Sequence, residues 1–116
     1  NSIIKELREK LEVKEYEHAK QYYRTRRYKS AVIALENAMK TYPDSRFRED
    51  MLFLIVESNY ELAINSIEAK KEERLLDTVE SYHKFVDSYG ESSRLNEAER
   101  WYGNALAELE RIREKK

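Results

Sequence analysis

The chain has 116 residues, enough for one domain, of which 41% are hydrophobic and 39% are charged. Its 22 Lys and Arg residues nearly balance 23 Asp and Glu residues, so the net charge is -1, which argues against a dedicated nucleic-acid binder because such proteins carry a basic excess. The absence of cysteine excludes disulfides, thiolate catalysis and cysteine-based metal sites. No run of about 18 apolar residues is present to span a membrane.

Two helices are predicted first, over residues 2–25 and 28–41. Apolar residues recur in both at spacings of three or four, with charges between them, which is typical of amphipathic helices. The turn between them is Thr25-Arg26-Arg27. Pro43 cannot continue the second helix and biases Tyr42 away from the α region.

Three more helices are predicted over about 46–69, 73–89 and 94–114. Asp44 or Ser45 is expected to cap the first of these, and Ser92 or Ser93 the last. Lys70 to Arg74 is predicted as a charged turn, and Gly90 as a left-handed C-terminal cap. The helix over 46–69 has apolar residues on more than one side, which indicates burial on more than one side. Trp101 is expected in the core.

The order of residues repeats with an offset of 47. Tyr42-Pro43-Asp44-Ser45 closes one helical stretch, and Tyr89-Gly90-Glu91-Ser92 closes another. The preceding apolar positions keep the same offset, in the pairs Val32 and Val79, Leu35 and Tyr82, and Met39 and Val86. A fixed-period repeat of helix, turn and helix predicts an all-α solenoid, whose stacked repeats build one core and present an extended surface for binding.

The spacing of Ala31, Leu35, Ala38 and Pro43 fits the tetratricopeptide (TPR) signature A-x3-F-x2-A-x4-P. The second unit is degenerate, with Thr78, Tyr82, Phe85 and Gly90 at these four positions. We therefore predict a single TPR-like domain of about five antiparallel helices over residues 1–116.

The arrangement resembles the BamD family of outer-membrane assembly lipoproteins, which are TPR proteins. The resemblance is carried by Tyr16-Glu17-His18-Ala19-Lys20-Gln21-Tyr22-Tyr23, Arg27-Tyr28, Ala31-Val32, Tyr42-Pro43-Asp44-Ser45, Arg48-Glu49-Asp50 and Asn59-Tyr60. It covers roughly residues 2–64 and is similar to the C-terminal part of the family's array. Residues 65–116 are expected to add a C-terminal repeat and a capping helix. The whole chain is expected to be a fragment of a longer lipoprotein.

The resemblance implies a non-catalytic scaffold on the periplasmic face of the bacterial outer membrane. Its expected partners are the periplasmic domains of the β-barrel insertase BamA and nascent outer-membrane proteins. Membrane attachment would need an N-terminal lipid that this cysteine-free chain cannot carry. Arg48 matches the family's insertase contact, and its neighbours Asp44, Phe47 and Asp50 complete the predicted partner-binding turn.

In the TPR frame, a second candidate site faces the concave side of the solenoid. It consists of Tyr16, Lys20, Tyr23 and Arg24, and aromatic and Arg side chains are enriched in interface hot spots. Tyrosine also fills gaps between helices, so a packing role for Tyr16 and Tyr23 is equally compatible with the pattern.

Two other classes of function stay open. The chain could be a TPR adaptor that binds peptides in another compartment, or a homo-oligomer formed through Ala98, Trp101, Tyr102 and Ala105 of the last helix. No enzyme, cofactor or metal site is predicted. His18 and His83 lack the spacing of metal ligands, and no glycine-rich phosphate loop is present.

Overall fold

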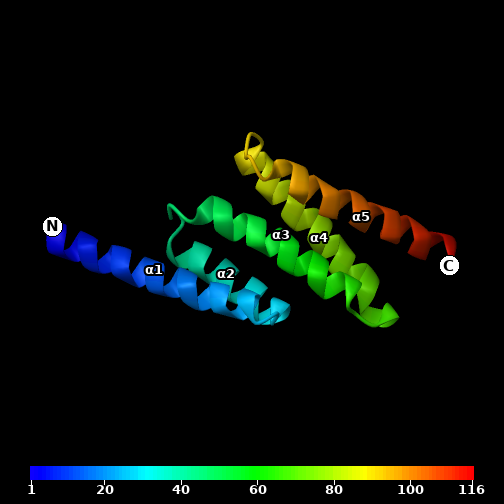
Figure 1. The fold of residues 1–116 in the computed structure, drawn as a ribbon, viewed down its shortest axis with the longest axis horizontal. Helices are drawn as coiled ribbons and strands as arrows, with labels where there is room; N and C mark the ends of the chain where they lie inside the picture. Colours follow the sequence, from blue (N-terminus) through cyan, green and yellow to red (C-terminus); the bar gives the residue numbers. More distant parts are fainter.

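The computed structural model describes residues 1–116 as five α-helices with no strand (Figure 1). The helices are α1 (Ser2–Arg24), α2 (Tyr28–Thr41), α3 (Arg48–Ile64), α4 (Glu68–Tyr89) and α5 (Leu95–Glu114). The predicted all-α, TPR-like solenoid is confirmed, and α2 has the predicted bounds.

Each helix packs against its neighbours in the chain, and the two termini lie at opposite ends of the molecule (Figure 1). The helical body measures 59 × 28 × 19 Å, with a radius of gyration of 15.7 Å. A compact globule of this length would have a radius of about 13 Å. The protein is therefore elongated, as expected when helices stack in a row rather than around one centre.

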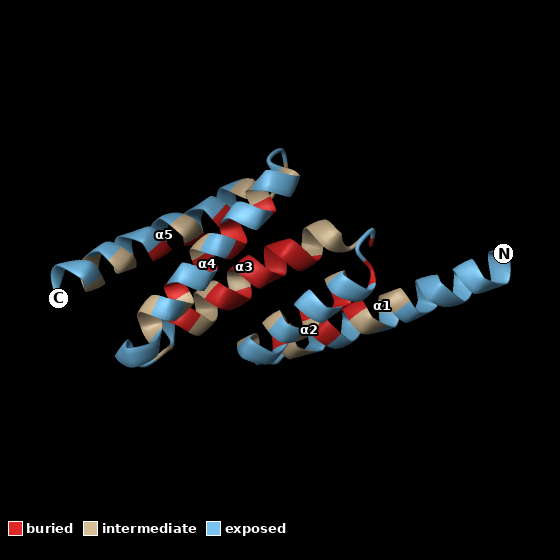
Figure 2. Cartoon of the chain, turned by 180° about the vertical axis from the view of Figure 1, so that it is seen from behind, coloured by how far each residue is buried: buried red, intermediate tan, exposed pale blue.

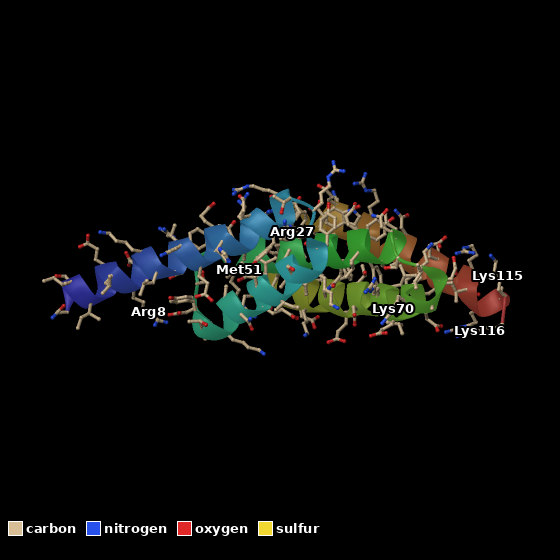
Figure 3. The ribbon with its side chains drawn as sticks, turned by 90° about the horizontal axis from the view of Figure 1, so that it is seen from below. Arg8, Arg27, Met51, Lys70, Lys115 and Lys116 are labelled. Carbon is tan, nitrogen blue, oxygen red and sulfur yellow. The ribbon has the colours of Figure 1, made fainter.

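The core follows α3, which contacts α2 and α4 on its two sides and α5 beyond them. All six residues from Met51 to Val56 are buried, so this segment has no solvent-facing stripe (Figure 2). Met51 is only 1% exposed and lies in the middle of the stack when the molecule is viewed from below (Figure 3). A helix that is apolar all round must be enclosed, so the predicted burial of this helix on more than one side is confirmed.

The repeat predicted from the sequence is present in the packing. The TPR positions of α2, Ala31, Leu35 and Ala38, are all at most 1% exposed. Their partners 47 residues later in α4 are also buried, namely Thr78, Tyr82 and Phe85. Both helices thus bury the same face, α2 between α1 and α3 and α4 between α3 and α5. The degenerate second unit keeps the geometry with larger side chains.

The repeat also relates α1 to α3, with a different offset of 37. Tyr16 packs under Phe47 of the following turn, and Phe53 packs under Arg94 at the corresponding place one repeat later. The offset is shorter than 47 mainly because α2, with 14 residues, is shorter than α4, with 22. The order α1-α2-α3 is therefore repeated as α3-α4-α5, with α3 shared.

The turn between α3 and α4 lies at residues 65–67, so the predicted charged turn from Lys70 to Arg74 is wrong. Asn65 and Ser66 end α3, because their side chains donate hydrogen bonds to the carbonyl oxygens of Glu61 and Leu62. The guanidinium of Arg74 reaches back to the Ser66 hydroxyl at 2.7 Å. The charged run instead lies in the first turns of α4, near the position labelled Lys70 in Figure 3. Lys70 is exposed, whereas Lys71 pairs with Glu108 at 3.4 Å.

One predicted detail at a helix end also differs. Gly90 has φ -61 and ψ -14, a right-handed helical conformation, so the expected left-handed cap is wrong. The left-handed residue of the chain is Arg26, with φ 61, in the turn between α1 and α2. A short turn of three residues forces this conformation there, although Arg has a Cβ that disfavours it.

Candidate partner-binding face

The turn between α2 and α3 is held by a serine rather than by a helix cap. The Ser45 hydroxyl accepts a hydrogen bond from the Phe47 amide at 3.0 Å and donates one to Glu12 of α1 at 2.6 Å. Ser45 is buried, and Phe47 stands at the N-cap of α3 without a side-chain cap. Ser45 therefore ties the turn to α1, which fixes the position of the residues that follow.

The turn between α4 and α5 uses the same device. The Ser92 hydroxyl accepts from the Arg94 amide at 3.1 Å and donates to Glu49 of α3 at 2.9 Å. Each turn is thus fixed to the first helix of the preceding repeat, α1 or α3. The two turns belong to a rigid edge of the solenoid, because their anchors are hydrogen bonds to charged groups.

The first three residues of α3 are charged, and the side chains of two of them are hydrogen-bonded. Glu49 accepts a hydrogen bond from the Ser92 hydroxyl, and Asp50 accepts one from the Arg94 guanidinium at 2.6 Å. Lys20 of α1 also approaches Asp50, at 3.9 Å. Arg48 is half-buried and forms no side-chain hydrogen bond or ion pair. The predicted contact residue is therefore a cation held on a fixed turn without a partner in its own chain.

The neighbours predicted to share this contact divide into two kinds. The Phe47 ring stacks on Tyr16 at 4.2 Å with an angle of 3° between the planes, and Arg46 covers its other face at 4.8 Å. Phe47 thus packs the turn against α1, and Asp50 is held by Lys20 of α1 and by Arg94 just before α5. Asp44 is exposed, so Asp44 and Arg48 are the residues of this set with a free polar group.

The predicted concave groove is mostly occupied by contacts within the chain. Tyr16 is 5% exposed and belongs to the core, so its ring cannot face an open groove. Lys20 lies over that ring at 5.1 Å, and Arg24 pairs with Glu17 at 3.4 Å. Tyr23 is half-buried and donates its hydroxyl to Glu57 at 2.9 Å. Lys20, Tyr23 and Arg24 remain reachable at the rim.

Glu57 is a residue of this face that the sequence reasoning missed. The pKa of its carboxyl is raised above the ordinary value, chiefly by burial. The hydrogen bond from Tyr23 opposes this shift, and the nearby carboxylates of Glu97 and Glu61 add to it. Burial and the bond to Glu57 likewise raise the pKa of the Tyr23 phenol. The repeat offsets could have revealed the pair. Tyr60 lies 37 residues after Tyr23 and Asn104 lies 47 residues after Glu57, and these two side chains are also hydrogen-bonded, at 3.2 Å.

The last helix does not offer the self-association surface considered above. Ala98, Trp101 and Ala105 are all at most 5% exposed within a single chain, and Tyr102 stacks on Tyr82 at 4.2 Å. That version of the homo-oligomer is therefore wrong. The expected core position of Trp101 is confirmed, with Phe53 at 5.2 Å.

The stacked antiparallel helices and their serine-anchored turns define the class of this protein as a TPR-like α-solenoid. The YfiO family model, described as outer membrane lipoprotein, matches residues 1–76. The match covers more than half of the chain, so the chain belongs to this family, which includes BamD. It extends beyond residue 64, where the resemblance seen in the sequence ends. No match was found among curated proteins. None of the five helices is long and apolar enough to cross a membrane.

Proposed function

We propose that this protein is a non-catalytic scaffold in the assembly of outer-membrane β-barrel proteins. It works on the periplasmic face of the outer membrane and binds the periplasmic domains of a BamA-like insertase. Residues 1–64 correspond to late repeats of the family's array, and residues 65–116 add a further repeat and a closing helix. The observation that carries the proposal is the family match together with the unpartnered Arg48 on a fixed turn.

The geometry of the turn supports a docking role for Arg48. Its backbone is positioned by the Ser45 turn, so little conformational entropy remains to be lost there on binding. A cation in the first turn of a helix opposes the helix dipole and adds nothing to local stability. An acidic or carbonyl-rich partner surface would supply the hydrogen bonds that Arg48 lacks, with Asp44 on the same turn available to a donor.

The test is binding of the full chain to purified periplasmic domains of the insertase, measured by biolayer interferometry. We expect saturable binding that weakens at least about tenfold in Arg48→Glu, because an interface residue worth more than about 1.4 kcal/mol shifts Kd by that factor. Arg113→Glu is the matched control, since Arg113 is exposed at the far end of α5 and makes no ion pair.

Circular dichroism must show the same helical content in both variants. Unchanged binding by Arg48→Glu would refute the contact, and absence of binding by the folded wild type would refute the scaffold function in this form. Nascent outer-membrane proteins are the second proposed partner, at the rim formed by Lys20, Tyr23 and Arg24. If an unfolded outer-membrane protein binds the chain without displacing the insertase domains, the two partners bind different surfaces.

A further inference from the structure

An open groove separates α2 from α4 along one side of α3. Both helices pack on α3, but they do not contact each other. The groove consists of two adjoining cavities of about 240 and 220 Å³, and both are lined by Val32, Asn59 and Asp77. Its apolar floor comes from α3 and consists of Leu52, Ile55 and Leu62. Repeats of a solenoid stack at its two ends, so an added repeat would not occupy this groove.

A buried polar side chain lies on the floor of the groove without a partner. Asn59 is 9% exposed and lines both cavities, and its carboxamide forms no hydrogen bond within the chain. One repeat earlier, 37 residues before it, the corresponding residue is the larger Tyr22. A carboxamide can donate two hydrogen bonds and also accept, and a buried polar group left unpaired is costly. A ligand in the groove would supply the missing partner.

The two walls of the groove carry charges in the same order. α2 and α4 both run antiparallel to α3, so they are parallel to each other (Figure 1). Lys29 and Lys70 line one cavity, one from each wall. Glu36 and Asp77 follow them by seven residues and line the other cavity. Seven residues of helix rise about 10.5 Å, so each wall has a cation and, about 10 Å further on, a carboxylate. None of these four side chains forms an ion pair within the chain.

The other charged residues of the groove leave this pattern unchanged. Arg74 donates to the Ser66 hydroxyl, and Lys84 pairs with Glu80 at 3.3 Å. Partial burial raises the pKa of the Asp77 carboxyl, the carboxylates of Glu73 and Glu80 raise it further, and Arg74 opposes the shift. Negative charge is therefore in excess at this end of the groove, where a cation from outside the chain would relieve the repulsion.

We propose that the groove between α2 and α4 binds an extended peptide segment of a partner protein, with an acidic and a basic side chain three residues apart. The acidic side chain pairs with Lys29 and Lys70. The basic side chain pairs with Glu36 and Asp77. Three residues of extended chain span about 10 Å, which matches the spacing of the charges on the walls.

Asn59 is the reason for an extended segment rather than a helix. It lies on the floor between the two charged ends, where it would meet the main chain of the occupant. An extended chain presents free N–H and C=O groups to a carboxamide, whereas those of a helix are already paired with each other. The Asn59 carboxamide thus binds a main-chain amide of the segment, and the charges on the walls select its side chains.

The probe is a fluorescein-labelled peptide of about eight residues, blocked at both ends, with Glu and Lys three residues apart in a background of Ser and Thr. Two control peptides carry Glu at both positions or Lys at both. Binding to the full chain is measured by fluorescence anisotropy. We expect saturable binding of the Glu/Lys peptide, and binding at least about tenfold weaker for both controls, because each opposes like charges at one end.

Two variants test the residues of the groove. Asn59→Leu should weaken binding at least about tenfold without lowering the thermal midpoint, because Leu has a similar size and removes a buried unpaired group. Glu36→Lys combined with Asp77→Lys should change the preference to the Glu/Glu peptide. Both residues are exposed, so this variant should fold.

Glu91→Lys combined with Glu110→Lys is the matched control for the change in net charge. Both residues are exposed, form no ion pair and lie outside the groove. This variant should keep the preference of the wild type for the Glu/Lys peptide. Circular dichroism must show the same helical content in all variants.

Three results would overturn the proposal. The first is no saturable binding of the Glu/Lys peptide, and the second is a preference that the paired lysine substitutions in the groove do not change. The third is a concentration-dependent mass in analytical ultracentrifugation that Asn59→Leu abolishes, because the occupant would then be a second copy of this chain. Arg48→Glu should leave peptide binding unchanged, so this proposal and the insertase contact can fail separately.

Discussion

Phe85→Ala should destabilise the protein more than any other substitution considered for it. Phe85 is fully buried in α4, and its ring lies 5.8 Å from Phe53 and 6.1 Å from Tyr89. Truncating a buried Phe costs about 3–5 kcal/mol, because the lost transfer free energy is joined by the energy of the cavity left behind. Full burial between α3 and α4 places this site near the middle of that range, at about 4 kcal/mol.

The loss can be measured by urea denaturation followed through the fluorescence of Trp101, the single tryptophan, which is 5% exposed beside Phe53. With a slope of about 2 kcal/mol per M urea, a loss of about 4 kcal/mol lowers the midpoint by about 2 M. Leu76→Ala in the same helix is the control, and its midpoint should move little because Leu76 is 54% exposed. Equal shifts in both variants, or no shift in Phe85→Ala, would refute the packing of α4 on α3 described above.

Two further predictions concern stability. Glu57→Gln should raise the free energy of unfolding increasingly as pH rises. Burial, opposed by the Tyr23 bond and supported by Glu97 and Glu61, holds the pKa of Glu57 above its ordinary value of 4.5, so the folded chain binds this proton more tightly than the unfolded chain. That contribution is complete below the unfolded pKa and is lost as pH rises through the folded pKa. Denaturation at several values between about pH 4 and pH 7 should show the two profiles diverging, and parallel profiles would contradict the assignment. Gly103→Ala should stabilise the chain by about 0.5–1 kcal/mol, because Gly103 lies within α5 and an added Cβ would meet nothing within 4 Å. A lower thermal midpoint for this variant would show that α5 is not helical at that position.

The serine-anchored turns explain how a chain with few glycines and one proline makes sharp reversals. Ser45 and Ser92 each accept a hydrogen bond from the following backbone and donate one to a carboxylate of the first helix of the preceding repeat. The same two serines mark the repeat in the sequence. The pattern that revealed the architecture is thus also the pattern of hydrogen bonds that fixes its edge.

The amino-acid sequence by itself determined the helices, the repeat of 47 and the face that each repeat buries. These features are local or periodic, because apolar spacing and a helix-stopping proline act within a few turns of the chain. The pairs Leu35 with Tyr82 and Ala38 with Phe85 therefore follow from residue spacing alone, and all four residues are buried. The turn before Arg48 was also locatable, since Arg48 lies three residues after the motif Tyr42-Pro43-Asp44-Ser45.

Only the tertiary structure decided which side chains of these elements are free. Tyr16 looks like a groove residue in sequence, but Phe47 of a later turn covers it. The charged run from Lys70 to Arg74 looks like a turn, but it lies within α4, because a charged side chain reaches solvent or an ion-pair partner from a helix and does not end it. Contacts of this kind join residues distant in the chain, so no local pattern encodes them.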